Sequence, residues 1–328
     1  MVKKEIKRIG IFTSGGDAPG MNAAIRAVVR TAAYHNLHTY GIYRGLQGMI
    51  EGEIKRIETG DVSNIMHRGG TILKTARSDQ FMTVEGRKLA YENLVAHGID
   101  ACVAIGGNGT FTGSLLFSQE YDIPFMGLPG TIDNDLYGTD WTIGFDTALN
   151  TAMEAVDRIR DTADSHNRLF FVEVMGRNSG YLALNTAIGS GAGMVLVPEK
   201  KTNIEELVSI LKTSAKRKKL FSIIIVAEGN EIGSAAEVAK LVTERFEYYD
   251  IKVTVIGHLQ RGGSPSCLDR VLASRLGYEA VEGLLQGKYN VMVGSVNNEV
   301  HFTGFEDAIS KKKPLNQDLM KMAEILAS

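Results

Sequence analysis

Short apolar segments alternate with amphipathic segments along the chain, and this alternation restricts the possible folds more than any other feature of the sequence. The first apolar run, 8–12, leads into a glycine-containing loop and then into 21–35, where Ile25, Val28 and Ala32 recur at helical spacing. Strands and helices that alternate in this way form parallel sheets covered by helices. The sequence therefore predicts the α/β class.

The pattern starts again near the middle of the chain, whose 328 residues are too many for one ordinary core. The first series has expected strands at 8–12, 39–43, 102–105 and 123–128 and expected helices at 21–35 and 86–97. The second series has expected strands at 169–174, near 195, at 223–226 and at 253–256, and expected helices at 147–161, 204–216 and 235–248. We therefore predict two similar Rossmann-like lobes, each a mainly parallel sheet covered by helices, with a boundary near Ile143.

Composition argues against nucleic acid and a membrane as partners. Lys and Arg number 36 against 38 Asp and Glu, and no long basic block interrupts the chain, which argues against nucleic acid as the main partner. Only Cys102 and Cys267 are present, and the first residues lack a long apolar run. These features are typical of a cytoplasmic protein without disulfides, signal peptide or membrane span.

The loop at 129–135 follows the apolar run 123–128 and contains two carboxylates and a hydroxyl. In open α/β sheets, ligands bind outside the carboxyl ends of the strands, so these groups are expected where chemistry takes place. Asp133 is the candidate general base. Asp and Asn are also good turn formers, which is the alternative interpretation of Asp133-Asn134-Asp135.

Two glycine-containing loops, Gly15-Gly16 and 106–110, each lie between an expected strand and an expected helix. Backbone N–H groups and a helix N-terminus favour an anion at such a place, and a phosphate is the expected ligand. Neither loop is a Walker A motif, because Gly20 is followed by Met21-Asn22 and not by Lys-Ser or Lys-Thr. Plain tight turns remain the alternative.

Arginines at strand ends and glycine turns extend this pattern. Four of them, which could bind a phosphate in a bidentate manner, are Arg77, Arg168, Arg177 and Arg261. For each one alone, a solvated surface charge is the alternative. Glu228 and His258 also follow expected strands, although a buried core histidine is an equally good interpretation of His258.

Five segments together resemble the signature segments of bacterial ATP-dependent 6-phosphofructokinase, from about Lys7 to the C-terminus. They are 13–22 with Thr13-Ser14-Gly15-Gly16-Asp17, then Arg68-Gly69-Gly70-Thr71, 129–135, Val172-Glu173-Val174-Met175-Gly176-Arg177, and Gly257-His258-Leu259-Gln260-Arg261-Gly262-Gly263-Ser264-Pro265. The resemblance implies transfer of the γ-phosphoryl group of ATP to the 1-hydroxyl of fructose 6-phosphate, a step of glycolysis, in a homotetramer of two-lobed subunits. It also implies an ATP-binding lobe of residues 1–143 and 259–309 and a fructose 6-phosphate-binding lobe of residues 144–258 and 310–328.

The resemblance further implies a role for each matching residue. Asp133 would take the proton of the sugar hydroxyl with Thr131 beside it, and Arg177 and Arg77 would be the positive groups over the moving phosphoryl group. ATP would be held by Gly16, Arg77, Ser78, Gly107, Asn108, Gly109 and Thr110, and its Mg²⁺ by Asn108 and Asp135. The sugar phosphate would be held by Thr131, Ile132, Asp133, Met175, Gly176, Arg177, Glu228, His258, Leu259, Gln260 and Arg261, and by Arg168 and Lys252 of a neighbouring subunit.

Departures from the family's pattern bear on metal binding and on regulation. Asn108 stands where the family usually has an aspartate that contacts magnesium, and Lys252 where it usually has an arginine. In the effector site of this allosteric family, Gly193 stands in place of a glutamate and Thr59 in place of an arginine. The residues that match this effector site are Arg26, Arg30, Arg160, Arg217 and Lys219. We therefore expect at most weak activation by ADP.

Three other functions compete with this interpretation. Pyrophosphate-dependent phosphofructokinases typically have aspartate at position 109 and lysine at position 130, where this chain has Gly109 and Gly130. NAD and diacylglycerol kinases share a similar glycine loop but lack segments like 175–177 and 258–263. A nucleotide or sugar-phosphate sensor without catalysis is supported by Asn108 alone, and the retained Asp133 argues against it because a sensor needs no base.

Overall fold

The computed structural model describes residues 5–163, 168–216 and 222–327, and this part of the chain divides into two compact units. The first unit contains the residues up to Ile132, together with Leu136–Thr147 and Arg261–Lys313. The second contains Asp133–Asp135, Ala148–Gln260 and the residues from Pro314 onward. The boundaries expected from the sequence placed 133–135 in the first lobe, whereas this short segment packs with the second unit.

The first unit is built on a seven-stranded sheet in the order β11-β10-β5-β4-β1-β2-β3. Its strands are β1 (Arg8–Thr13), β2 (His38–Ile42), β3 (Ile54–Ile57), β4 (Ala101–Gly106), β5 (Phe125–Pro129), β10 (Val291–Val296) and β11 (Glu299–Gly304). The five central strands are parallel, and β3 and β11 are antiparallel at the two edges. This arrangement confirms the predicted α/β class, and it brings the ends of β1, β4 and β5 to one edge.

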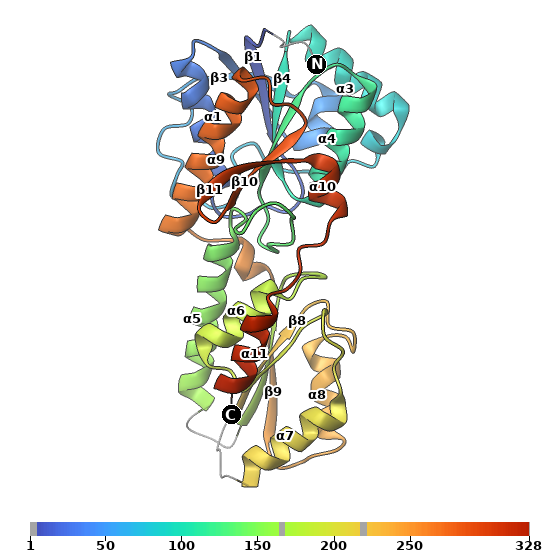
Figure 1. Cartoon of the computed structure of the whole chain (residues 1–328), viewed down its shortest axis with the longest axis vertical. Helices are drawn as coiled ribbons and strands as arrows, with labels where there is room; N and C mark the ends of the chain where they lie inside the picture. Colours follow the sequence, from blue (N-terminus) through green and yellow to red (C-terminus); the bar gives the residue numbers. More distant parts are fainter. Residues whose placement is uncertain (1–4, 164–167, 217–221, 328) are drawn as a thin grey trace. The chain divides into compact units, whose positions relative to one another are not determined.

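Helices cover both faces of this sheet (Figure 1). They are α1 (Met21–Tyr34), α2 (Gly45–Glu51), α3 (Val84–Ala96), α4 (Asn108–Glu120), α9 (Cys267–Leu285) and α10 (Phe305–Ser310), with a 3-10 turn η1 (Gln80–Met82) before α3. α1 packs beside α9 on one face, and α3, α4 and α10 lie on the other.

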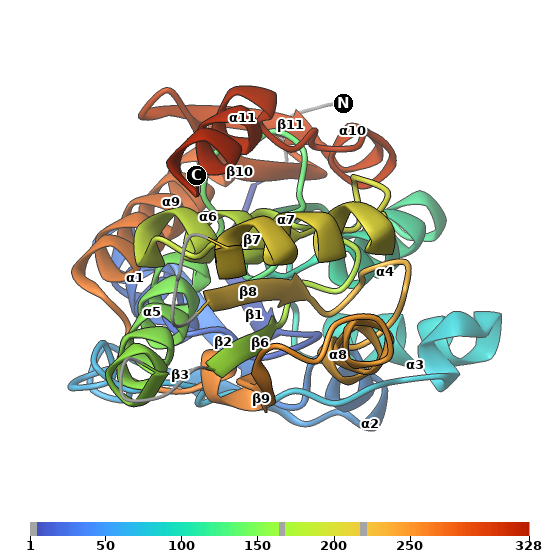
Figure 2. The same cartoon turned by 90° about the horizontal axis from the view of Figure 1, so that it is seen from below.

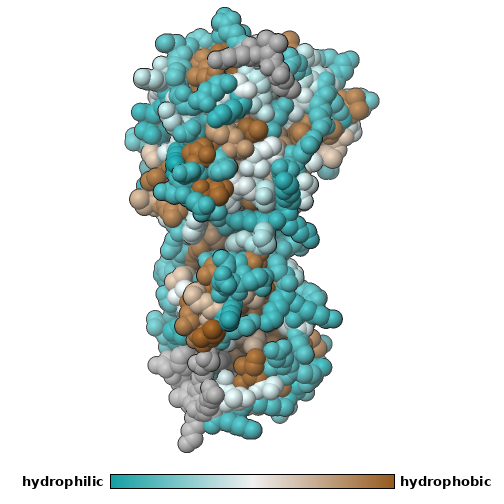
Figure 3. Space-filling model, in the orientation of Figure 1, coloured by the Kyte–Doolittle hydropathy of each residue, from teal (hydrophilic) through white to brown (hydrophobic). Residues whose placement is uncertain are grey.

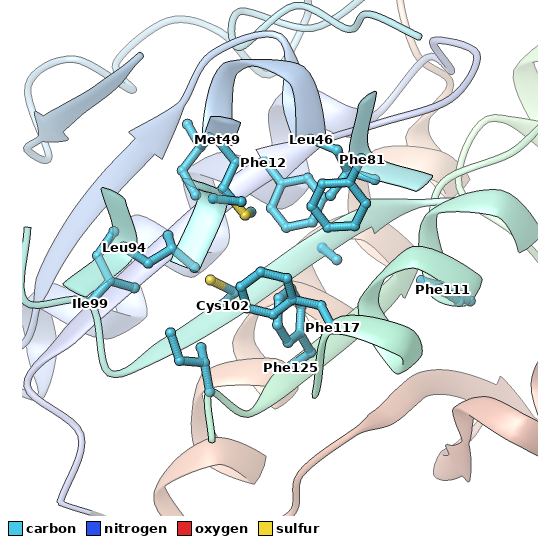
Figure 4. Close-up of a cluster of buried hydrophobic side chains, with 14 of the residues drawn as sticks. Phe12, Leu46, Met49, Phe81, Leu94, Ile99, Cys102, Phe111, Phe117 and Phe125 are labelled. Carbon is cyan, nitrogen blue, oxygen red and sulfur yellow. The ribbon is translucent and has the colours of Figure 1, made fainter. Parts of the chain in front are cut away.

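The core under α2, α3, α4 and α10 is aromatic (Figure 4). The ring of Phe125 meets the rings of Phe12 and Phe117 edge to face, with centroids 6.3 and 5.6 Å apart, and Phe81 stacks on Phe117. Edge-to-face packing suits the quadrupoles of the rings. Cys102 lies among these rings, and burial raises the pKa of its thiol. This cysteine therefore packs as an apolar side chain of the core.

The second unit has a four-stranded, fully parallel sheet in the order β7-β8-β6-β9 (Figure 2). Its strands are β6 (Arg168–Val174), β7 (Met194–Leu196), β8 (Ser222–Ala227) and β9 (Asp250–Val255). Its helices are α6 (Tyr181–Ser190), α7 (Ile204–Lys216), α8 (Ala235–Thr243) and α11 (Gln317–Leu326), with a 3-10 turn η2 (Gly257–Arg261). Inward residues such as Leu169, Phe171 and Val226 pack against α7 and α8.

One long helix, α5 (Phe145–Ala163), begins in the first unit and continues in the second. Its first turn is held by Asp269 of α9, which has no exposed surface. The Asp269 carboxylate accepts hydrogen bonds from the N–H groups of Gly144 and Thr147 (both 2.8 Å) and from the Thr147 hydroxyl (2.5 Å). It therefore satisfies donors that the start of a helix leaves without partners inside the helix.

Candidate active site

In the first unit, the glycine loops after β1 and β4 lie side by side. The N–H of Ser14 donates to the carbonyl of Ile105 (3.0 Å), and the N–H of Gly130 donates to the carbonyl of Gly106 (3.0 Å). A Cβ atom at Gly106 would lie 2.5 Å from the carbonyl oxygen of Ser14, so this close approach requires glycine. The structure thus brings the predicted nucleotide loops together at the carboxyl ends of adjacent strands.

The start of α4 offers room and polar groups beside these loops. Its N-cap is Gly107, and no atom lies within 4 Å of the position that a Cβ atom of Gly109 would occupy. The hydroxyl of Thr110 is buried between Gly15 and Gly106 and has no hydrogen-bond partner among the described residues. A buried hydroxyl without a partner in the protein is a polar contact that a bound ligand can complete.

Arg261, which the sequence assigned to the sugar phosphate, is the last residue of η2, and its side chain packs against the loop that contains Gly16. A Cβ atom at Gly16 would be 2.4 Å from Nη1 of Arg261, which also donates to the carbonyl of Asp17 (3.3 Å). A side chain at position 16 would therefore displace the guanidinium, which is the end of a flexible side chain, from this place. Arg261 and Gly16 are therefore neighbours in the structure, although the sequence assigned Gly16 to ATP and Arg261 to the sugar phosphate.

The segment that carries Arg77 and Ser78 is anchored by a residue that the sequence reasoning missed. The buried guanidinium of Arg87 donates to the carbonyls of Phe81 (3.0 Å) and Met82 (2.9 Å) and forms two hydrogen bonds with Glu120, both of 2.6 Å. The bond to Glu120 raises the pKa of Arg87 and lowers that of Glu120. Arg87 stands in an ordinary polar position of a helical pattern, so no local signal marks it.

Ser78 and Arg77 differ in how they are held. The Ser78 hydroxyl donates to Gln47 (2.7 Å) and accepts from the N–H of Phe81 (3.2 Å), so it is held by the η1 turn. Arg77 is exposed. Of these two residues, Ser78 is thus engaged in hydrogen bonds of the turn, whereas Arg77 is accessible to a ligand.

In the second unit, the segment Asp133–Asp135, which follows β5 along the chain, and the loop after β6 bring Asp133 and Arg177 together. Nε of Arg177 is 3.9 Å from Oδ2 of Asp133, and the Asp133 side chain is 6% exposed whereas the Arg177 side chain is 67% exposed. The hydroxyl of Ser179 donates to the backbone carbonyl of Asp133 (2.9 Å). A buried carboxylate beside an accessible cation is an arrangement suited to proton abstraction next to an anionic group.

The other residues predicted for the sugar phosphate fall into two groups. Glu228 accepts a hydrogen bond from the backbone N–H of Arg177 (3.2 Å), and the buried side chain of Gln260 accepts one from the N–H of Met175 (2.8 Å). These two side chains therefore hold the loop after β6. His258 and Leu259 are exposed on η2, so the interpretation of His258 as a core histidine is wrong.

Arg168 and Lys252 lie at the opposite end of the second unit's sheet from Arg177. Both flank Asp250, with Nε of Arg168 3.4 Å from Oδ2 and Nζ of Lys252 2.8 Å from Oδ1. The hydrogen bond with Lys252 and, to a smaller extent, the contact with Arg168 hold the pKa of Asp250 below its usual range. Within the second unit, the structure does not bring this basic pair to Asp133.

The residues predicted for an effector are spread over several elements. Arg26 and Arg30 are one turn apart on α1, and burial together with the nearby Arg30 lowers the pKa of Arg26. Arg160, on α5, donates to the carbonyl of Ser190. Arg217 and Lys219 lie outside the described residues.

A cavity in the second unit has a volume of about 380 Å³ and lies between β7, α7 and α11. Its lining is mainly apolar and includes Leu207, Ile210 and Met320. On the face drawn in Figure 3, hydrophobic residues form several separate patches among hydrophilic ones. None of the residues predicted for ATP or the sugar phosphate lines this cavity.

Metal-binding side chains do not form a cluster in the part of the chain that the structure describes. No three His, Cys, Asp or Glu side chains lie together there in an arrangement that could hold an ion. Asn108 and Asp135 offer one amide and one carboxylate, which are hard oxygen donors that suit Mg²⁺ when substrate phosphates and waters complete the shell. None of the described helices is both long and apolar enough to cross a bilayer.

Known proteins resemble this chain over nearly its whole length. The model of the family described as Phosphofructokinase matches residues 8–284. This chain belongs to the phosphofructokinase family. ATP-dependent 6-phosphofructokinase 2 of Bacteroides thetaiotaomicron is 54% identical over 322 residues, which cover 98% of this chain and 99% of that phosphofructokinase. ATP-dependent 6-phosphofructokinase 1 of Thermus thermophilus is 53% identical over 322 residues, which cover 98% and 100%.

Solved structures of phosphofructokinases share the fold. The structure of phosphofructokinase from Saccharomyces cerevisiae matches with a TM-score of 0.88 and 36% identity over 92% of this chain. The match covers 45% of the yeast chain, so this phosphofructokinase spans less than half of that longer protein.

Proposed function

We propose that this protein is an ATP-dependent 6-phosphofructokinase, which transfers the γ-phosphoryl group of ATP to the 1-hydroxyl of fructose 6-phosphate and gives fructose 1,6-bisphosphate and ADP. The observation that carries the proposal is the buried Asp133 beside Arg177, in a chain 54% identical to a protein of that name. The protein would act in glycolysis in the cytoplasm.

Asp133 is the proposed general base. Its carboxylate takes the proton from the 1-hydroxyl as the oxygen attacks phosphorus, and Thr131 lies two residues before it. Arg177 and Arg77 stabilise the negative charge on the phosphoryl oxygens. Phosphoryl transfer depends mainly on positioning and charge neutralisation, so these few groups suffice for the chemistry.

The first unit holds ATP in this proposal. The loops at Gly16 and 107–110 provide backbone N–H groups for its phosphates, and Thr110 offers its buried hydroxyl. Mg²⁺, held by Asn108, Asp135 and phosphate oxygens, would supply further neutralisation of charge.

The second unit holds the sugar phosphate through the loop 175–177 and Glu228, with His258 on η2. We further propose a homotetramer in which Arg168 and Lys252 serve the sugar-phosphate site of a neighbouring subunit. Regulation is weak in this proposal, because Gly193 and Thr59 remove a carboxylate and a cation from the effector site.

Pyrophosphate is the less favoured donor on two counts. The space at Gly109 is open to a bulky nucleotide, because no atom lies within 4 Å of its Cβ position. At Gly130 a Cβ atom would be 3.0 Å from both Ile105 and Met21, so a lysine there would force its neighbours to shift.

A coupled assay with fructose 6-phosphate, run in parallel with ATP and with pyrophosphate, tests the proposal. The wild type should phosphorylate fructose 6-phosphate with ATP and not with pyrophosphate. Gly109→Asp should reduce the use of ATP, because a carboxylate would repel the nucleotide phosphates in a confined site. Gly60→Ala is the control, since its Cβ atom would meet nothing within 4 Å. Pyrophosphate turnover at the rate of ATP would overturn the assignment of the donor.

A further inference from the structure

Arg177 has a backbone conformation that a residue with a side chain rarely adopts. Its φ is 49°, in the left-handed region, and it follows Gly176 with a φ of 141°. For a non-glycine residue this region is strained, so the surrounding structure must hold it there. The residue that carries the strain is the one whose guanidinium lies beside Asp133.

Two consecutive residues after β8 hold this conformation. Glu228 accepts the N–H of Arg177 through Oε2 (3.2 Å), and its own N–H donates to the carbonyl of Val174 (2.9 Å). The carbonyl of Arg177 then lies directly against Gly229. A Cβ atom at Gly229 would be 1.8 Å from that oxygen and 2.7 Å from the carbonyl carbon.

Gly229 is needed there for space and not for its own backbone freedom, because its φ lies outside the left-handed region. Any side chain would push the Arg177 peptide away by backbone displacement, since no flexible side chain is available to yield. The next residue would also move, because the Cα of Asn178 lies 3.3 Å from the same position.

We infer that Gly229 is a positioning residue for catalysis: by admitting the carbonyl of Arg177, it fixes the left-handed turn that directs the guanidinium to Asp133. This inference rests on the proposed function. The Arg177 side chain is 67% exposed, so few side-chain contacts hold it, and the backbone turn sets where it begins. The other side of the turn is held by Ser179, whose N–H donates to Gly176 and whose hydroxyl donates to the carbonyl of Asp133.

The test is a double-mutant cycle with Gly229→Ala and Arg177→Met, measured as kcat and KM for both substrates. Gly229→Ala alone should lower kcat by on the order of 10²-fold, the scale of a misplacement of about 1 Å, and leave the KM for ATP within about twofold. In the Arg177→Met background the same change should cost less than about twofold, because the group that it misplaces is already gone. Gly60→Ala should leave all constants unchanged.

Melting temperatures give a readout that does not need activity. Gly229→Ala should lower the melting temperature less in an Arg177→Gly background than in the wild type, because glycine at 177 lets the turn relax. Two results would overturn the inference. One is an unchanged kcat in Gly229→Ala, and the other is a loss of kcat on Gly229→Ala that is equal in the wild type and in Arg177→Met. A wild type inactive with ATP and fructose 6-phosphate would instead overturn the proposed function, and the coupling in melting temperature would still report the contact.

Discussion

Replacing Asp269 by asparagine tests which of two opposing effects sets the charge of a buried carboxylate. Asp269 has no exposed surface, and its oxygens accept three hydrogen bonds from Gly144 and Thr147 at the start of α5. Burial raises the pKa of Asp269 from its ordinary value of 3.8 to about 6, although the hydrogen bonds act in the opposite direction.

The pKa difference fixes the sign and the size of the effect. The folded protein binds a proton at Asp269 more tightly than the unfolded chain, so the contribution of this group to stability grows as the pH falls from 6 to 4. A rise of about 2 pKa units corresponds to about 3 kcal/mol. The carboxyl of the unfolded chain, with its ordinary pKa of 3.8, is already partly protonated at pH 4. The free energy of unfolding of the wild type should therefore increase by about 2.4 kcal/mol relative to Asp269→Asn between pH 7 and pH 4.

Urea unfolding of both proteins at pH 7, 6, 5 and 4 measures this difference. Carboxylates that do not interact with Asp269 contribute equally to both proteins, so their contributions cancel. Asp161→Asn, which changes an exposed carboxylate of α5, is the control for the loss of one negative charge. A difference that shrinks as the pH falls would refute the reasoning, because it would mean that the hydrogen bonds and the helix N-terminus outweigh burial.

Three further predictions concern the reaction. Asp133→Asn should lower kcat by on the order of 10²–10⁴ with an unchanged melting temperature, and a loss smaller than about tenfold would mean that another group takes the proton. Asn108→Asp should lower the magnesium concentration for half-maximal rate, by about 1–2 kcal/mol of effective binding, the scale of adding a charge to a contact. If a magnesium titration of kcat/KM shows a greater requirement, Asn108 acts as a donor through its amide. A mixture of inactive Asp133→Asn and Arg168→Ala chains should regain activity after subunit exchange, and failure to do so, with exchange confirmed by mass, would place both residues in one subunit's site.

Much of the fold follows from local patterns because buried parallel strands are apolar and short. The hairpin of β10 and β11 was missed, although its turn carries a signal: Asn297 and Asn298 both have positive φ, 51° and 64°. Asparagine tolerates that region, and two such residues between alternating apolar positions are typical of a two-residue hairpin. The edge strand β3 is only four residues long and leaves little pattern to detect.

The residues of the candidate site also divide into those that the sequence could indicate and those that only the structure shows. Residues in loops that follow strands, such as Asp133 after β5 and Glu228 after β8, could be named as candidates because ligands bind outside the carboxyl ends of parallel strands. Arg87 and Asp269 were not. The carboxylate that pairs with Arg87, Glu120, lies 33 residues away, and Asp269 accepts a hydrogen bond from the N–H of Thr147, which lies 122 residues earlier. Gly229 was equally hidden, since only the path of the Arg177 carbonyl shows what a side chain there would meet.

The position of Arg168 also bears on why we propose that sugar-phosphate sites are shared between subunits. Arg168 begins β6 and Arg177 follows its end, and a seven-residue strand spans roughly 20 Å. That distance is more than an arginine side chain reaches, so Arg168 cannot join Arg177 on one phosphate within its own unit. Lys252 lies on β9, an edge strand whose Val253 and Val255 are 40% and 59% exposed. We propose that a second subunit covers this apolar, open edge beside the basic pair and brings its own phosphate site within reach of the pair.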